Sequence, residues 1–92
     1  MLERRVLIMN RLGLHARAAA RLVRTASGFT SNIRLSRTDG SATADAKSIL
    51  SVLLLAAARG TELLLTVEGR DEAVALTAVC ELFECKFGEE RV

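Results

Sequence analysis

The 92-residue sequence predicts an α+β fold, a two-layer sandwich in which helices cover one face of a sheet. Two observations lead to this prediction. Segments with strand-like and helical patterns follow one another in the order βαββαβα. In addition, Asp39-Gly40 is a strong hairpin signal between two of the predicted strands. A chain of this length is typical of one domain, and we expect residues 1–92 to form a single domain.

The first half of the chain supplies three strands and one helix. A short apolar run with a β-branched bias, Arg5–Met9, predicts the first strand. Apolar residues then recur at helical spacing over Ala16–Ser27, which predicts a helix. Alternation over residues 31–37 predicts the second strand, and the hairpin joins it to a short third strand at 41–45. The inward stripe of the helix should consist of Ala19, Leu22, Val23 and Ala26.

The second half supplies two helices and the fourth strand. Ser48 is a preferred N-cap residue, and we expect the second helix to open there and close at Gly60. Residues 61–69 predict the fourth strand. The last helix should lie within residues 70–87, with Asp71 as its N-cap, and residues 88–92 should fray. Its inward stripe should consist of Ala73, Leu76, Cys80 and Phe83.

Composition is that of an ordinary globular domain, with 50% hydrophobic and 26% charged residues. The charge is unevenly distributed. Residues 1–37 hold eight arginines and one glutamate, which gives +7, and residues 38–92 hold five basic and ten acidic residues, which gives −5. A basic first third suits contact with nucleic acid, anionic lipid or an acidic protein.

The cysteines and the hydropathy pattern bear on location. Cys80 and Cys85 are five residues apart on the predicted last helix, so they point in different directions and should not form a disulfide. Free thiols indicate a reducing compartment. No apolar stretch is long enough for a signal peptide or a membrane span, so we expect a cytoplasmic protein without membrane insertion. Two cysteines and one distant histidine do not make a metal site.

The only histidine, His15, lies where Ser, Thr, Asp or Asn would ordinarily cap the helix that begins at Ala16. The first turn of a helix presents unpaired N–H groups and a partial positive charge. These features disfavour a cationic imidazolium, so we expect a neutral, nucleophilic His15, and they favour a bound anion beside it. A nucleophilic nitrogen beside an anion site suits phosphoryl transfer.

Arginines extend this predicted site. Arg17 is placed to contribute a further cation, and Arg21 and Arg24 share its face of the helix. The residues alone leave other interpretations open, namely an inert surface histidine and an arginine face that is merely solvated. A basic module for nucleic acid is another alternative. The lack of tyrosine and tryptophan for base stacking, and the acidic second part of the chain, argue against it.

Three stretches resemble the family of histidine-containing phosphocarrier proteins, HPr, of the phosphoenolpyruvate-dependent phosphotransferase system. They are NRLGLHARAAARLVRTASGFTSNIRLS, DGSATADAKSIL and AARGTELLLTVEGRDEAVAL. The likeness extends from Arg5 to about Phe87, and the Gly-Leu-His-x-Arg core joined to a later Lys-Ser-Ile is its most specific part. The resemblance implies an open-faced sandwich, a four-stranded antiparallel sheet with three helices on one face.

The resemblance also implies a function for the predicted site. His15 would accept a phosphoryl group on Nδ1 from phospho-enzyme I, and Arg17 would help to hold that group. The carrier would then pass it to a histidine on an A domain of enzyme II or on a related regulatory protein. Such a carrier is a relay rather than an enzyme and binds no cofactor itself. Docking to many partners through one face is simplest for a monomer.

Ser48 matches a serine that a dedicated kinase phosphorylates in many relatives. Ser48 could instead serve only as a cap, and both roles are compatible. The resemblance permits a further alternative, a regulatory HPr-like protein controlled through Ser48 with little transport role. It also implies a docking patch beside the histidine, although the leucines in it could all belong to the core. The patch would consist of Ala16, Arg17, Ala20, Arg21, Arg24, Leu50 and Leu53.

The chain departs from the family pattern at Ala18, where proline is usual. Proline suits the first turn of a helix because its φ is preset and its missing N–H is not needed there. We therefore expect alanine at this position to lower stability modestly and to leave the chemistry at His15 intact. The departure leaves open whether the carrier serves sugar uptake or a nitrogen-related, regulatory relay.

Overall fold

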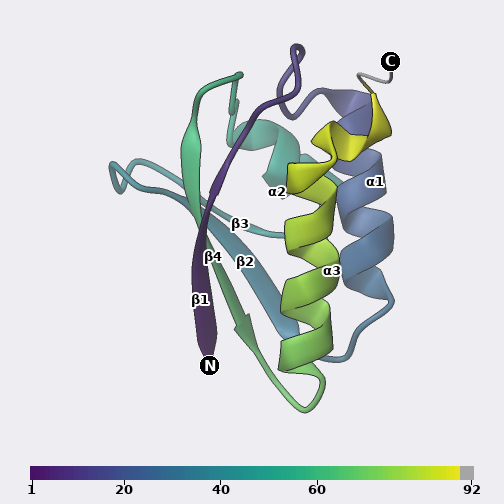
Figure 1. The fold of residues 1–92 in the computed structure, drawn as a ribbon. Coiled ribbons are helices and arrows are strands. Elements are labelled where there is room, and N and C mark those ends of the chain that lie inside the picture. The colour runs from purple at the N-terminus through teal and green to yellow at the C-terminus, as the bar shows by residue number, and fades with distance from the viewer. Residues whose placement is uncertain (90–92) are drawn as a thin grey trace.

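Four strands form one antiparallel sheet in the order β1-β4-β2-β3. This computed structural model describes residues 1–89. The strands are β1 (Leu2–Leu7), β2 (Asn32–Arg37), β3 (Thr43–Asp45) and β4 (Glu62–Glu68). The helices are α1 (Ala16–Ser27), α2 (Ile49–Leu54), α3 (Glu72–Glu84) and the 3-10 turn η1 (Lys86–Gly88). Figure 1 shows the helices on one face of the sheet, which confirms the predicted α+β sandwich and its element order.

Strand register determines which side chains enter the core between the sheet and the helices. On the central strand β4, side chains are alternately buried and more exposed. Leu65 of β4 lies opposite Leu35 of β2, and Val67 lies opposite Ile33, and all four are buried. The helices close the core from the other side with Leu22 of α1, Val52 of α2, and Val79 and Phe83 of α3.

The first strand begins and ends earlier than predicted. β1 pairs with β4 from Leu2, opposite Val67, to Leu7, opposite Glu62, rather than covering residues 5–9. Its first residues are polar. Pairing with the main chain of β4, rather than apolar side chains, keeps them extended. Ile8 still exchanges main-chain hydrogen bonds with the turn before β4, although it lies beyond the assigned strand.

The second helix is much shorter than predicted. It begins after Ser48, as expected, but ends at Leu54 and not at Gly60. The backbone of Ala56 has a φ of 49°, which takes the chain out of the helical direction. The next residue then accepts a hydrogen bond on its carbonyl from Leu14 N at 2.9 Å. Pairing with the segment before α1 has therefore outweighed the helical propensity of three alanines in succession.

The first helix has the predicted bounds, whereas the inward stripe of the third differs from the prediction. In α1, Ala18 is fully buried in addition to three of the four predicted residues, and Val23 is only partly buried. In α3, Ala73 is exposed. The buried residues of α3 are Ala75, Leu76, Val79, Cys80 and Phe83.

Asp71 precedes α3 as predicted, but its side chain makes no cap hydrogen bond there. Instead its carboxylate accepts hydrogen bonds from the main chain of Thr30 at 2.9 Å and of Ser31 at 3.0 Å, and from the Ser31 hydroxyl. These bonds, the Ser31 hydroxyl first, lower the pKa of Asp71 from 3.8 to about 2. These hydrogen bonds to Asp71 thus connect the loop between α1 and β2 to the start of α3.

Two further expectations concern the cysteines and the membrane. Cys80 is buried and Cys85 is exposed, and both are free thiols, as predicted. Within residues 1–89, no helix has the length and apolar character needed to cross a membrane.

Candidate functional site

The predicted site lies at the end of a tightly held loop that leads into α1. Gly13 has a φ of 67°, and a Cβ atom there would lie 2.5 Å from the Ala57 carbonyl oxygen. Only glycine therefore permits the close approach of this loop to the chain after α2. With Leu14 N bonded to the Ala57 carbonyl, the backbone on the N-terminal side of His15 is fixed.

His15 is the N-cap of α1, as predicted, and its imidazole performs the capping itself. Nδ1 accepts a hydrogen bond from Arg17 N at 3.3 Å, so the ring replaces the oxygen of an ordinary cap. Nε2 lies 2.5 Å from Oε2 of Glu89. The His15 side chain is 24% exposed, so it is partly accessible from solvent.

Glu89 and Asn10 belong to the site, and the sequence alone indicated neither. Asn10 is fully buried, and its Nδ2 donates to the Gly13 carbonyl at 2.7 Å and to Glu89 Oε1 at 2.9 Å. Glu89 lies in the segment expected to fray, so that expectation is wrong for residues 88–89, while residues 90–92 lie outside the described part. Nothing local in the sequence signals a contact between residues 74 positions apart.

The three arginines of α1 are in different surroundings. Arg17 is exposed and lines a shallow cleft beside the histidine together with Arg11, Leu12 and Glu89. Arg21 is partly buried, and its guanidinium donates to the Phe87 carbonyl oxygen. Arg24 is exposed in the last turn of α1, away from His15. The common face predicted by spacing therefore holds one arginine beside the histidine.

Ser48 is the N-cap of α2, as predicted. Its Oγ accepts a hydrogen bond from Ser51 N at 3.3 Å, and its own amide donates to Asp45 O at 3.0 Å. The side chain is half-buried, and the first turn of α2 holds no acidic residue.

An apolar surface extends along α2, and we call its four residues, Ile49, Leu50, Leu53 and Leu54, the α2 patch. Their exposed fractions are 44%, 65%, 38% and 71%. Val52 and Leu55 form the opposite, buried face of the helix. The interpretation of all these leucines as core is therefore wrong. Of the small residues predicted beside them on α1, Ala16 is exposed and Ala20 is half-buried.

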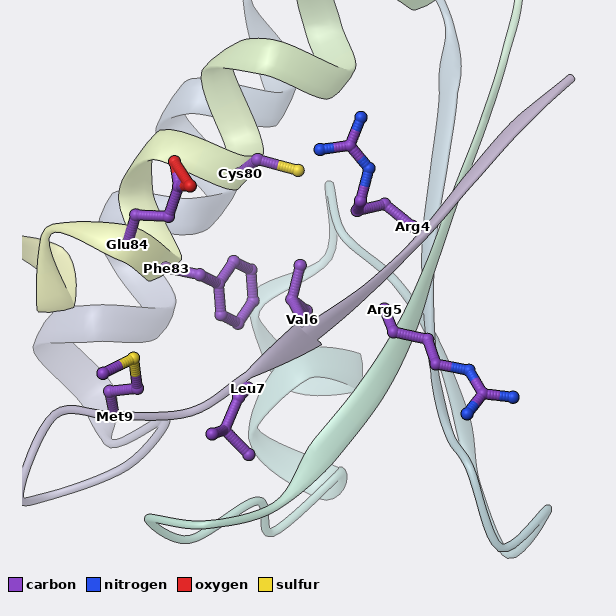
Figure 2. Close-up of a pocket in the computed structure, with 8 residues that line it drawn as sticks. All are labelled: Arg4, Arg5, Val6, Leu7, Met9, Cys80, Phe83 and Glu84. Atoms are coloured by element: carbon purple, nitrogen blue, oxygen red, sulfur yellow. The ribbon is translucent and has the colours of Figure 1, made fainter.

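A separate cavity of about 150 Å³ lies between β1 and α3 (Figure 2). Figure 2 shows Val6 and Phe83 at its centre, with Arg4 directed toward Cys80 and Arg5 directed to the other side of the strand. Burial raises the pKa of the Cys80 thiol, which makes it a poor nucleophile. None of the residues that line this cavity contributes to the histidine site, and residues 1–89 contain no group of His, Cys, Asp and Glu arranged to hold a metal ion.

Comparisons with known proteins identify the family of this chain. Residues 2–85 match the family model described as "PTS HPr component phosphorylation site". The chain belongs to the HPr family. It is 50% identical to Phosphocarrier protein HPr of Xylella fastidiosa strain 9a5c, over 98% of this chain and 99% of that one. It is also 43% identical to Phosphocarrier protein NPr of Shewanella violacea, over 96% of this chain and 94% of that one.

Solved HPr structures show the same fold. HPr-C-His of Thermoanaerobacter tengcongensis superposes with a TM-score of 0.91 at 42% identity, covering 99% of this chain and all of the other. A second structure from that organism, described as an HPr dimer, gives a TM-score of 0.75 at 42% identity, over 97% and 100% of the chains. The general role that follows from HPr membership is that of a phosphocarrier in the phosphotransferase system, a relay protein that works with enzyme I and enzyme II components.

Proposed function

We propose that His15 is the residue of this HPr that carries the phosphoryl group. It accepts the group on Nδ1 from phospho-enzyme I and passes it to an A domain of enzyme II or to a related regulatory protein. One observation supports this assignment above the others. Nδ1 of His15 is turned toward the first-turn amides of α1, where it accepts from Arg17 N.

The amides explain why a phosphoryl group is accommodated there. The first four N–H groups of a helix lack intrahelical acceptors, and the helix dipole favours negative charge beside them. When the Nδ1 lone pair forms the bond to phosphorus, it no longer serves the Arg17 amide, and a phosphoryl oxygen takes its place as acceptor. The exposed side chain of Arg17 lines a cleft together with Glu89 and supplies a full positive charge close to the site.

We assign the docking of partner proteins to the surface around this site. The proposed contact surface combines the α2 patch with side chains along α1, from the first turn after His15 to the last turn. An apolar patch of this kind on a small protein is typical of a partner-binding surface. Arginines at its edge would favour an acidic partner. The predicted docking residues in this surface are Ala16, Arg17, Ala20, Arg24, Leu50 and Leu53, whereas Arg21 is engaged by the Phe87 carbonyl.

Ser48 is proposed as a regulatory phosphorylation site for a serine kinase, with a phosphorylase to reverse it. Its hydroxyl lies immediately before Ile49 and Leu50 of the α2 patch. A phosphate would add about −2 charges there, be tolerated locally by the helix dipole, and repel an acidic partner. This arrangement also supports the second candidate function, a regulatory HPr with little transport role. We further propose that residues 1–92 act as one monomeric, cytoplasmic domain.

The deciding experiment is transfer of labelled phosphate from phosphoenolpyruvate by the cognate enzyme I. Wild-type protein should take up one phosphoryl group per chain in an acid-labile, base-stable linkage. His15→Ala should take up none, and Ser48→Ala, the matched control, should behave as wild type. Equal labelling of His15→Ala would refute the assignment. Steep salt-dependent binding to DNA or RNA without labelling would instead favour a nucleic-acid module.

A further inference from the structure

The last described residues of the chain are held against the histidine site rather than free at the surface. Phe87 is 1% exposed and packs edge-on against Phe83, with ring centroids 5.0 Å apart. The Phe87 carbonyl accepts a hydrogen bond from the Arg21 guanidinium. Figure 1 shows this C-terminal turn beside the beginning of α1.

An unusual backbone directs this segment. Lys86, Phe87 and Gly88 have φ values of 57°, 56° and 71°, a left-handed conformation that two of these residue types seldom adopt. Such backbone persists only where surrounding contacts impose it. Here the buried ring and the Arg21 bond impose it, and the turn places the next residue, Glu89, over the N-terminal end of α1.

Both carboxylate oxygens of Glu89 are engaged there. Oε1 accepts from Asn10 Nδ2 at 2.9 Å, and Oε2 lies 2.5 Å from His15 Nε2. The Glu89 side chain is only 8% exposed, and Asn10 is completely buried. The carboxylate is thus oriented from a fixed point in the protein, and it fixes the imidazole in turn.

The two contacts of the His15 ring specify one tautomer. A carboxylate can only accept, so the proton of that hydrogen bond belongs to Nε2. The Arg17 amide can only donate, so Nδ1 must offer its lone pair. Both contacts are satisfied together only by a neutral ring protonated at Nε2. This form presents Nδ1 as the nucleophile.

We propose that Glu89 is a positioning residue for phosphoryl transfer, which holds His15 in the Nε2–H tautomer and orients Nδ1 toward the helix amides. This inference rests on the proposed role of His15. In the step itself, the Nδ1 lone pair forms the bond to phosphorus, and the bond from phosphorus to the donor atom breaks with its electron pair left on the donor. The ring gains positive charge while Nε2 keeps its proton, and the adjacent carboxylate stabilises that charge.

In hydrolytic triads the two imidazole nitrogens have the same two separate roles. There a carboxylate on one imidazole nitrogen sets the tautomer and stabilises the imidazolium, while the other nitrogen does the chemistry. The Glu89–His15 pair has this arrangement with Nδ1 and Nε2 exchanged.

The test compares Glu89→Ala, Glu89→Gln and the control Glu81→Gln, which alters an exposed carboxylate on α3. Because His15 is the only histidine, its two ring nitrogens can be followed directly by 15N-detected NMR of unphosphorylated protein. Wild type and Glu81→Gln should show the Nε2–H pattern. Glu89→Ala should show mixed tautomers and a rate of phosphoryl uptake lower by about tenfold, since misorientation of a reacting group is costly. Glu89→Gln keeps an acceptor without its charge and should fall between them.

Two results would overturn the proposal. One is a wild-type NMR pattern in Glu89→Ala, because the carboxylate would then not set the tautomer, whatever the rate. The other is an altered tautomer with an unchanged rate, because orientation would then not matter for transfer. Thermal unfolding of each variant identifies any loss of fold. If wild-type protein takes up no phosphate at His15, the proposed function fails, and the NMR comparison still decides how Glu89 acts on the ring.

Discussion

Replacement of Ala18 by proline should stabilise this HPr. Ala18 is the third residue of α1, and the helical partner of its amide would be Leu14 O, which precedes the helix. The first bond of the helix ladder runs instead from Ala19 N to His15 O at 2.8 Å. Proline at position 18 therefore removes no ladder bond, and its fixed φ reduces the freedom of the unfolded chain.

The expected gain is about 0.4–1 kcal/mol, the usual effect of a compatible proline. For a domain of this size, that corresponds to an increase in Tm of roughly 2–8 °C by calorimetry. Ala19→Pro is the matched control. It removes the bond to His15 O and should cost about 3 kcal/mol or more. A Tm of Ala18→Pro below wild type would refute the reasoning, because it would show that the buried first turn has no room for the ring.

Other predictions concern docking, pH and thiol reactivity. Leu50→Ser should raise the carrier concentration needed for half-maximal phosphorylation by about tenfold, as loss of a docking side chain does, whereas Val74→Ser, at a 60% exposed site on α3, should not. Asp71→Asn should remove part of the acid sensitivity of folding. The lowered pKa of Asp71 contributes stability above its unfolded value of 3.8 that is lost as pH falls toward about 2, so Tm of the variant should change less over that range. Equal acid sensitivity of variant and wild type would contradict this. A thiol reagent followed by mass spectrometry should label exposed Cys85 before buried Cys80, whose raised pKa slows it further; the reverse order would exclude the assignment of Cys80 to the core.

Local patterns in the sequence were sufficient for α1 and for its cap. The spacing of apolar residues gives the bounds of α1, and the absence of a Ser, Thr, Asp or Asn before Ala16 singles out His15. Both signals involve residues close together in the chain. The end of α2 has no such signal, because contact with the loop before His15, rather than propensity, takes the chain out of the helix at Ala56.

The remaining site residues escaped prediction for the same physical reason. Glu89 reaches His15 only because Phe87 enters the core and Arg21 holds its carbonyl. Helical spacing placed Arg21 on the same face of α1 as Arg17, and it could not show that a carbonyl from the other end of the chain would lie there. Asp71 likewise suits an N-cap by type and position, yet the loop containing Ser31 offers its carboxylate better donors.

A phosphoryl carrier must bind its group weakly enough to give it away, and the distribution of charge around His15 suits this requirement. Interactions that stabilise the loaded form alone would lower its tendency to donate, by the same reasoning that separates ground-state from transition-state binding. Beside Nδ1 the structure places the Arg17 amide in the first turn of α1, and the exposed Arg17 side chain lines a nearby cleft with Glu89. The other two arginines of α1 do not add to them, since Arg21 is bound to the Phe87 carbonyl and Arg24 lies in the last turn. On the far side of the ring Glu89 stabilises positive charge on the imidazole, which helps the ring accept phosphorus, while its negative charge opposes accumulation of a second anion nearby. The C-terminal turn thus acts in two ways: Glu89 favours acceptance of the phosphoryl group, and the bond from Arg21 to the Phe87 carbonyl keeps a second guanidinium from stabilising the loaded form. We expect the second effect to keep the phosphoryl group transferable.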